Sequence, residues 1–327
     1  MNIIIGCSGS TGSSLLKTIL NRHPQIFAGP ETGLFAYPQV YSDWDVCKTS
    51  LLKGIQTDGW AVEKGMNLLQ DAYTWQTEEL KEAIQQAANF TEFVQVFFER
   101  PLKNQQKQYW IEKTPINAYG FQAFLANYPD GKVLQIVRNP YDTVASLVAR
   151  GLNAYWAAGY YVYNTAIATS SAQDSRYYQL SYENLVAQPE ATLVSLFKFL
   201  DLPFDSSIIQ ARHEQRAEPT TMKGWKHEET GAVKSSSIGR FQELPTKQQE
   251  LIKTALATFS IHPSYLKKYQ IQFATCADLC TQLNYPFLPP LHKKPSFVLK
   301  KYYWRSRLGR IRYKGLIACL EYPGRLY

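Results

Sequence analysis

Short apolar runs that alternate with helical segments constrain the fold of this chain more than any other feature. Asn2–Ile5 is a β-branched run that predicts a buried strand, and Ser13–Asn21 follows with apolar residues on one helical face. Lys132–Val137 predicts a second strong strand, and Pro140 directly after it suits the first turn of a helix. Strands that alternate with helices predict an α/β fold: a P-loop-like central parallel sheet flanked by helices.

The remaining expected elements extend this pattern over most of the 327 residues. We expect further strands at 26–28 and 109–113 and one ending at 179–180, and helices at 78–89, 91–100, 117–127, 190–200 and 246–259. Residues from about 40 to 105 are mostly helical in pattern, and we interpret them as a helical cap inserted into the α/β domain. The predicted organisation is one domain over residues 1–275 and a C-terminal extension over 276–327.

The net charge of +8 is concentrated at the C-terminus. Residues 292–327 hold ten Lys or Arg and one acid, whereas the rest of the chain holds 25 basic and 26 acidic residues. The aromatic residues that accompany this charge include Tyr302, Tyr303, Trp304 and Tyr313. Such a tail is either a solvated extension or a contact for an anionic surface or polymer. Nothing in it predicts specific nucleic-acid binding.

The termini and cysteines bear on the expected compartment. The start of the chain lacks the charged and apolar regions of a signal peptide, and no apolar run reaches the roughly 18 residues of a transmembrane helix. The five cysteines are odd in number and irregular in spacing, which favours reduced thiols over a disulfide framework. We therefore expect a cytoplasmic protein, whose basic tail could touch a membrane surface.

The segment GCSGSTGSS, residues 6–14, predicts an anion-binding loop. Its small residues let backbone N–H groups approach a ligand, and it leads into a helix N-terminus, where the dipole favours negative charge. Ser10, Thr11, Ser13 and Ser14 add hydroxyl donors. A Walker A loop would carry Lys after its second glycine, but Gly12 is followed by two serines. This difference disfavours a magnesium-nucleotide enzyme and leaves the source of positive charge open.

Further motifs follow in a consistent order. They are GPET at 29–32, EKTP at 112–115, VRNPYDTVASLVAR at 137–150, the segment 180–205 and SSSIGRF at 235–241. Together with the first loop, this set resembles the sulfotransferases that use 3′-phosphoadenosine 5′-phosphosulfate (PAPS) as donor. The resemblance covers about residues 1–260, and it is strongest to the Golgi protein-tyrosine and carbohydrate sulfotransferases and their bacterial relatives. It makes residues 1–275 the predicted sulfotransferase domain.

The resemblance implies a set of donor-binding residues. The first loop would hold the phosphosulfate, Arg138 and Ser146 the 3′-phosphate, and Tyr182 would pack near the adenine. Independently, a guanidinium at the end of a strand suits bidentate contacts to phosphate. Ser10 stands where the family usually has a basic residue. The full predicted set is Ser8, Gly9, Ser10, Thr11, Gly12, Ser13, Ser14, Arg138, Ser146, Tyr182, Lys234, Gly239 and Arg240.

The resemblance also implies the catalytic residues. Glu31 in GPET matches a glutamate that acts as general base, and Lys113 in EKTP matches a lysine that contacts the transferring group. Because Ser10 carries no charge, Lys113 is the predicted source of the missing cation. His23 is a weaker base candidate, since His23–Pro24 is also typical of a helix end. The family needs no metal, and the chain has no pattern of metal ligands.

The sequence leaves two other functions and the acceptor open. One alternative is a nucleotide-dependent kinase on a related P-loop fold, and the other is a catalytically inert nucleotide-binding relative. The hydroxyl acceptor could be a carbohydrate, a tyrosyl peptide, a lipid or a small phenol. The aromatic segment at 153–164 is either the lining of an acceptor cleft or the core stripe of a helix.

Overall fold

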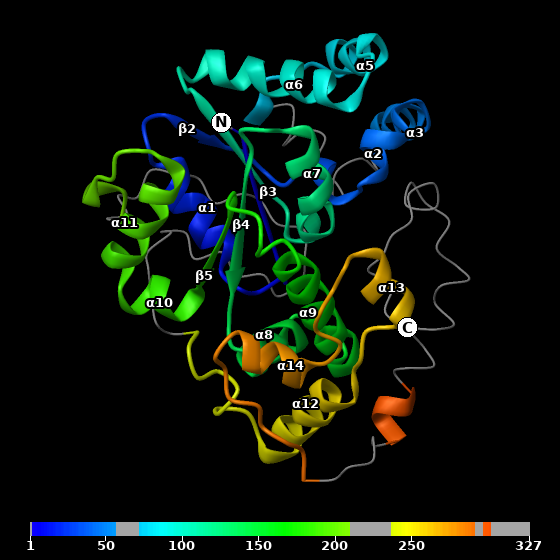
Figure 1. Ribbon diagram of the computed structural model, residues 1–327, viewed down its shortest axis with the longest axis vertical. Coiled ribbons are helices and arrows are strands. Elements are labelled where there is room, and N and C mark those ends of the chain that lie inside the picture. Colours follow the sequence, from blue (N-terminus) through cyan, green and yellow to red (C-terminus); the bar gives the residue numbers. More distant parts are fainter. Residues whose placement is uncertain (1, 57–71, 210–236, 292–296, 302–327) are drawn as a thin grey trace.

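The computed structural model describes residues 2–56, 72–209, 237–291 and 297–301. Its centre is a five-stranded sheet in the order β2-β3-β1-β4-β5, in which every neighbouring pair is parallel (Figure 1). The strands are β1 (Asn2–Cys7), β2 (Ile26–Ala28), β3 (Tyr109–Lys113), β4 (Lys132–Val137) and β5 (Tyr177–Ser181). The predicted α/β fold with a central parallel sheet is confirmed.

Helices cover both faces of this sheet, as Figure 1 shows. Ile3 and Ile5 of β1 are fully buried in one core, which they share with α1 (Ser13–Asn21) and α11 (Pro189–Leu200). Ile4 lies in a different core, on the side of α6 (Phe90–Asn104) and α7 (Phe121–Asn127). Successive strand residues point to opposite faces, so an unbroken isoleucine run is what a doubly covered strand requires.

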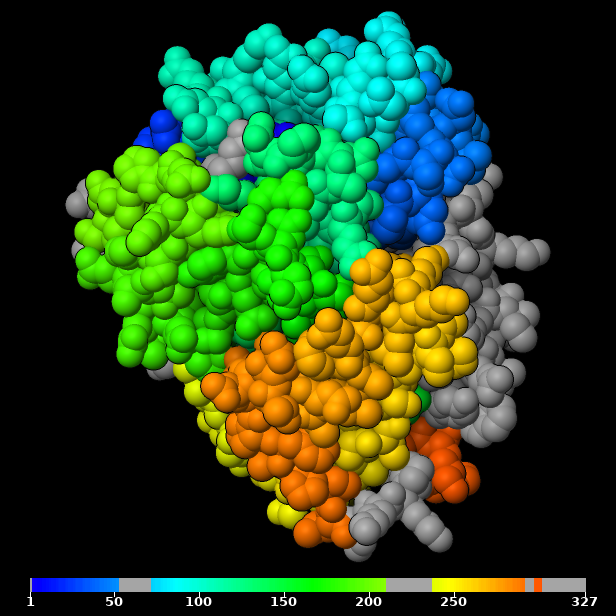
Figure 2. All heavy atoms as spheres, in the orientation of Figure 1, coloured from blue at the N-terminus to red at the C-terminus, as the bar shows by residue number. Residues whose placement is uncertain are grey.

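The described part of the predicted cap is helical. It comprises α2 (Gln39–Ser42), α3 (Trp44–Gln56), α5 (Thr77–Gln86) and α6, and it forms one end of the molecule (Figures 1 and 2). Its aromatic core continues onto the sheet, where Phe98 stacks on Trp110 of β3 with ring centroids 4.1 Å apart. Tyr73 reaches from the cap to the loop after β2, because its hydroxyl donates to the carbonyl of Pro30 at 2.7 Å.

A third core lies at the other end, below the carboxyl edge of the sheet. It is built from α8 (Pro140–Ala149), α9 (Ala154–Thr169), α12 (Thr246–Thr258) and α14 (Cys276–Gln282). Residues 276–291, the larger described part of the predicted C-terminal extension, pack onto this core and are orange in Figure 2. The described ranges also contain α10 (Tyr182–Ala187), α13 (Pro263–Lys268), three 3₁₀ turns at Leu34–Ala36, Pro115–Gly120 and Ser206–Ile208, and a helical segment at 297–301.

Two predicted helices differ from the structure: the one at 78–89 ends at Gln86, and the one at 117–127 begins later than expected. The segment 117–127 was expected to be a single helix, but its first part belongs to the 3₁₀ turn Pro115–Gly120, and α7 starts only at Phe121. Asn117 explains the difference, because its buried amide donates to the carbonyl of Ile5 and to the side chain of Glu112. These contacts with the sheet outweigh the local preference for an α-helix.

No helix in the described ranges is both long and apolar enough to cross a membrane.

Candidate functional site

The five parallel strands all end at one edge of the sheet, and the predicted site residues follow those ends. Loop 8–14 follows β1, Glu31 follows β2, Lys113 closes β3, Arg138 follows β4 and Tyr182 follows β5. In open parallel sheets this carboxyl edge is where ligands bind. The fold therefore gathers residues that lie as far as about 170 positions apart in the chain.

Loop 8–14 turns sharply into α1. Ser10 and Gly12 have positive φ angles of 68° and 94°. A Cβ added to Gly12 would lie 2.4 Å from the ring of Tyr182, so the glycine allows both the left-handed backbone and the close packing of that ring. Gly12 is also the N-cap of α1, and it provides no side-chain cap. The first N–H groups of the helix are thus left for another acceptor.

The hydroxyl groups of loop 8–14 differ in their hydrogen-bond partners. Thr11 donates to the carbonyl of Ser8 at 2.8 Å, which closes the loop internally. Thr11 and Ser13 also contact the thiol of Cys7, whose pKa burial raises. Ser14 faces Lys113, with 3.2 Å between Oγ and Nζ. Ser10 Oγ is buried without a hydrogen-bond partner among the described residues. Ser14 is therefore the hydroxyl that contacts the predicted catalytic lysine, and Ser10 is the one that keeps an unsatisfied hydroxyl.

Glu31 and Lys113 form an ion pair beside the loop. Lys113 Nζ donates to Glu31 Oε1 and to Ser14 Oγ, so one ammonium group joins the two segments. The side chain of Lys113 is 3% exposed, whereas that of Glu31 is 20% exposed. The carboxylate is thus the member of the pair that an approaching molecule could reach. The structure brings together the two residues that were predicted to act on the transferring group.

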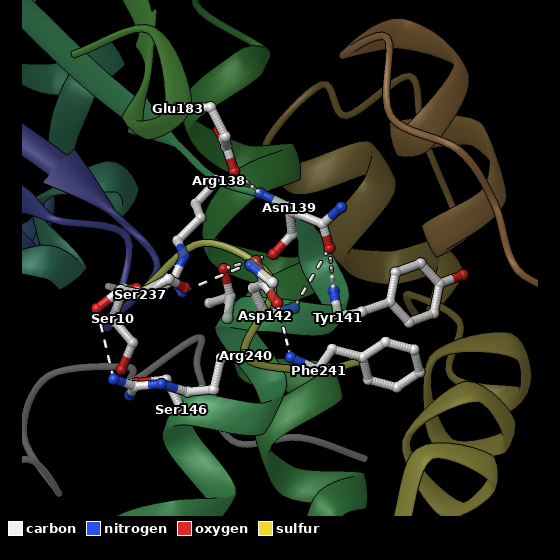
Figure 3. A network of polar contacts seen from close by, with 12 residues as sticks. Ser10, Arg138, Asn139, Tyr141, Asp142, Ser146, Glu183, Ser237, Arg240 and Phe241 are labelled. Carbon is white, nitrogen blue, oxygen red and sulfur yellow. Dashed lines mark hydrogen bonds and ion pairs between the residues drawn. The ribbon is translucent and has the colours of Figure 1, made fainter. Parts of the chain in front are cut away.

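Arg138 forms the centre of a second polar cluster on the other side of the loop (Figure 3). Its Nη1 donates to the carbonyl of Ser10 at 2.9 Å, and its Nη2 donates to the carbonyl of Ser237. Its guanidinium carbon lies 4.9 Å from the centre of the Tyr182 ring. Its Nε is buried without a partner in the described part of the chain. Burial lowers the pKa of Arg138, and a second arginine, Arg240, adds to this effect.

Asp142 on α8 fixes residues 237–241, the described part of the SSSIGRF motif and hereafter the late loop, against this cluster. Its two carboxylate oxygens accept hydrogen bonds from the backbone N–H groups of Gly239 at 2.9 Å and Phe241 at 2.8 Å (Figure 3). The residue between them, Arg240, reaches Ser146 with 3.2 Å between Nη1 and Oγ. Two backbone contacts to one carboxylate thus direct Arg240 toward the residues that were predicted to hold the 3′-phosphate.

Two residues of this cluster were missed in the sequence analysis: Asp142 and Arg150. Arg150 is half-buried, and its pKa is lowered by burial and then by the charges of Arg240 and Arg138, so three guanidinium groups lie near one another. The spacing of Asp142, Ser146 and Arg150 at intervals of four could have indicated that they belong to the same site. Residues four apart share one face of a helix.

The other predicted residues have mixed outcomes. Lys234 lies outside the described residues. His23 lies at the opposite edge of the sheet, where one ring nitrogen contacts the carbonyl of Pro203 at 3.1 Å and the other accepts from the N–H of Gln25. Those contacts fit a helix end. In the aromatic segment, Tyr161 and Tyr163 are core residues, whereas Trp156 and Tyr160 stack on each other and are half-buried.

Within the described ranges, no group of three or more His, Cys, Asp or Glu residues could hold a metal ion. The expectation of a metal-free site stays a prediction.

Comparison with known families decides the class of protein. A model of the sulfotransferase family matches residues 2–206, which include the first loop, Glu31, Lys113 and the Arg138 segment. The chain belongs to the sulfotransferase family. No curated protein sequence gives a significant match.

Solved sulfotransferase domains have a similar fold. The sulfotransferase domain of the Synechococcus PCC 7002 olefin synthase is 18% identical and superposes with a TM-score of 0.58, over 88% of this chain and 95% of that domain. The sulfotransferase domain from the curacin biosynthetic pathway is 20% identical, with a TM-score of 0.51, over 88% of this chain and 98% of that domain. At such identities the similarity shows the sulfotransferase fold.

Proposed function

We propose that this sulfotransferase uses PAPS as donor and transfers its sulfuryl group to a hydroxyl group of an acceptor. The observation that carries the proposal is that loop 8–14 touches two cationic groups at once: Lys113 through Ser14 and Arg138 through Ser10. A donor with a phosphosulfate at one end and a 3′-phosphate at the other has an anion for each of them. A ligand with a single anionic group would engage only one.

Buried polar atoms without partners support the fit of such a donor. Ser10 Oγ and Arg138 Nε are buried and lack hydrogen-bond partners among the described residues. Buried polar groups nearly always have a hydrogen-bond partner. Two neighbouring polar atoms without one therefore favour a ligand that forms the missing hydrogen bonds. The start of α1, which has no side-chain cap, adds backbone N–H groups next to Ser10 in the chain. The ring of Tyr182 packs against Gly12 and Arg138, so it would lie near the base of a donor held by these residues.

The residues would divide the chemistry as follows. The donor supplies the sulfuryl group. Glu31, the more exposed member of its ion pair, would accept the proton of the acceptor hydroxyl. Lys113 and the N–H groups at the start of α1 would stabilise the negative charge that builds up on the leaving oxygen. Lys113 contacts both Glu31 and Ser14, so it can replace the cation that Ser10 does not provide.

Calorimetric titration with adenosine 3′,5′-bisphosphate tests the donor. We expect binding without magnesium, because side chains and backbone groups provide all the positive charge in the proposed site. Binding of ATP with magnesium in preference to the bisphosphate would instead favour a kinase. Binding without turnover of labelled PAPS, over a panel of sugars, phenols and tyrosyl peptides, would favour an inert relative.

The variant Glu31→Gln tests the base. We expect turnover of labelled PAPS to fall by about 10²- to 10⁴-fold, the usual contribution of a positioned general base. Affinity for adenosine 3′,5′-bisphosphate should stay unchanged, because Glu31 is not among the residues proposed to hold the phosphates of the donor. Glu99→Gln, which removes a carboxylate from an exposed ion pair with Lys103 on the cap, is the matched control. Undiminished turnover in Glu31→Gln would remove Glu31 from this role.

A further inference from the structure

Glu112 on β3 is a fully buried carboxylate that the proposed chemistry does not use. Strands of a doubly covered parallel sheet are mostly apolar, as the neighbouring Trp110 and Ile111 are. Burying a carboxylate costs free energy that an apolar residue of similar volume would not cost. A glutamate at this position therefore calls for an explanation beyond the packing of the sheet.

The hydrogen bonds of Glu112 supply that explanation. Its Oε1 accepts from the backbone N–H of Thr32 at 2.7 Å and from the hydroxyl of Thr114 at 2.6 Å. Its Oε2 accepts from the amide of Asn117. Thr114 Oγ1 in turn accepts from the backbone N–H of Gly33 at 3.0 Å. The end of β3 thus holds two successive N–H groups of the loop that carries Glu31.

This loop is held on both sides of Glu31. On the preceding side, the carbonyl of Pro30 accepts the hydroxyl hydrogen of Tyr73 at 2.7 Å. On the following side, Thr32 is tied to Glu112. The side chain of Glu31 itself extends to Lys113, the strand residue after Glu112, and successive strand residues point to opposite faces. One strand end therefore supplies both the ion-pair partner of Glu31 and the anchor of its backbone.

We infer that Glu112 is a positioning residue, which places Glu31 for proton transfer by holding the N–H of Thr32. The inference rests on the proposed function, because it assigns Glu112 a role through Glu31. Misplacing a catalytic group by about 1 Å can cost on the order of 10²-fold in rate. The hydrogen-bond partners of Glu112 lie at 32, 114 and 117, outside loop 8–14 and the Arg138 cluster, so donor affinity should not depend on it.

Three variants separate positioning from packing. Glu112→Leu keeps the volume but releases Thr32, and we expect turnover of labelled PAPS to fall by about 10- to 100-fold with unchanged affinity for adenosine 3′,5′-bisphosphate. Glu112→Gln keeps an oxygen for Thr32 and Thr114, and we expect it to retain turnover. Gln135→Leu removes another fully buried polar side chain, from the middle of β4, and is the control for a disturbed sheet. We expect it to leave turnover unchanged.

A double-mutant cycle with Glu31→Gln decides the inference. If Glu112 acts through Glu31, adding Glu112→Leu to Glu31→Gln should lower turnover no further. The same fold-loss in both backgrounds would overturn the inference while leaving Glu31 as the base. Full turnover in Glu31→Gln alone would instead reject the proposed base, and the role of Glu112 with it. Turnover is measured with the best acceptor of the panel, or as labelled sulfate released to water.

A second variant and a direct measurement cover the case in which Glu112→Leu does not fold. Thr114→Val keeps the shape of Thr114 and removes the acceptor for Gly33, so a smaller loss of turnover is expected, again absent in Glu31→Gln. Hydrogen exchange of the peptide 29–34 should quicken in either variant, while the amides of β3 stay protected. Unchanged exchange in this peptide, or equal loosening of β3, would contradict the positioning role.

Discussion

Arg138 shows how one side chain connects the two halves of the candidate site. It follows strand β4, which lies beside the central strand β1, and it contacts the first loop through Ser10 and the loop 237–241 through Ser237. Its burial would be costly for an isolated charge, and Asp142, with 4.0 Å between Nη2 and Oδ2, offsets part of that cost. An anion in the cluster would offset more, which is the physical reason to expect phosphate there.

Replacing Arg138 tests this expectation. We expect Arg138→Ala to weaken binding of adenosine 3′,5′-bisphosphate by about 10- to 100-fold, since a charged hydrogen bond contributes about 1.5–3 kcal/mol. Isothermal titration measures the affinity. Arg100→Ala, which removes a cap arginine paired with Glu79, serves as the control and should bind normally. Equal affinity in Arg138→Ala and the wild type would remove Arg138 from the donor site.

Glu112 gives a prediction for the pH dependence of stability. Burial raises its pKa above the ordinary value, and the hydrogen bonds from Thr114, Asn117 and Thr32 lower it only in part. The folded protein therefore keeps the Glu112 proton to a higher pH than the unfolded chain. As the pH rises through that interval, the unfolded chain binds fewer protons, so the contribution of Glu112 to the free energy of unfolding falls.

The comparison with Glu112→Gln isolates this contribution, because glutamine does not titrate. As the pH rises above the ordinary pKa of a glutamate, we expect the free energy of unfolding of the wild type to fall relative to that of the variant. Urea denaturation at several pH values measures the difference. A difference that rises with pH would mean that the hydrogen bonds dominate over burial.

At the scale of elements, the junction of β1, loop 8–14 and α1 depends on the backbone of Gly12. Gly12 and Gly151 have nearly equal φ angles, 94° and 95°. A Cβ on Gly12 would collide with the Tyr182 ring, whereas a Cβ on Gly151 would meet nothing within 4 Å. The two glycines therefore form a matched pair that separates backbone strain from steric conflict at the site.

Alanine substitutions at these two positions make the comparison. We expect Gly151→Ala to cost about 1 kcal/mol of stability from the left-handed backbone alone. Gly12→Ala should cost more, by about 1–3 kcal/mol from overpacking, and should also weaken bisphosphate binding. Denaturant unfolding and titration measure the two effects. Equal losses in stability, with normal binding in both variants, would show that the Tyr182 ring moves aside at little cost.

At the scale of the whole molecule, the charge is strongly uneven. Residues 292–327 carry ten basic residues and one acid, and most of them lie outside the described residues. We propose that this tail binds anionic surfaces or polymers, since clustered Lys and Arg near an anionic membrane contribute about 1 kcal/mol each. This proposal is independent of the proposed donor site at the carboxyl edge of the sheet.

Deleting residues 302–327 tests the tail. The full chain should sediment with vesicles that contain phosphatidylserine, and raising the salt concentration should release it, because salt screens exposed charges. The truncated chain should sediment much less, while its affinity for adenosine 3′,5′-bisphosphate stays the same. Equal sedimentation of both chains would place the surface contact elsewhere. Vesicles of neutral lipid are the control.

Much of the fold could be predicted from local pattern. The bounds of β2, β3, β4 and α1 agree with the expected ranges, because β-branched runs and apolar spacing report directly on burial. The 3₁₀ turn at Pro115–Gly120 could not be predicted in this way, since the amide of Asn117 bonds to a strand over 100 positions earlier. A hydrogen bond between residues so far apart in the chain produces no periodic pattern of apolar residues that the sequence could reveal.

The sequence by itself determined the order of strands and helices, the prediction that loop 8–14 binds an anion, and the resemblance that placed the chain among sulfotransferases. Each of these follows from residues close together in the chain. Only the tertiary structure decided which polar groups meet: Lys113 with Glu31 and Ser14, Glu112 with Thr32, and Asp142 with the late loop. The reason is that a parallel sheet brings the ends of distant strands to one edge, so the partners of a site residue depend on strand order rather than on distance along the chain.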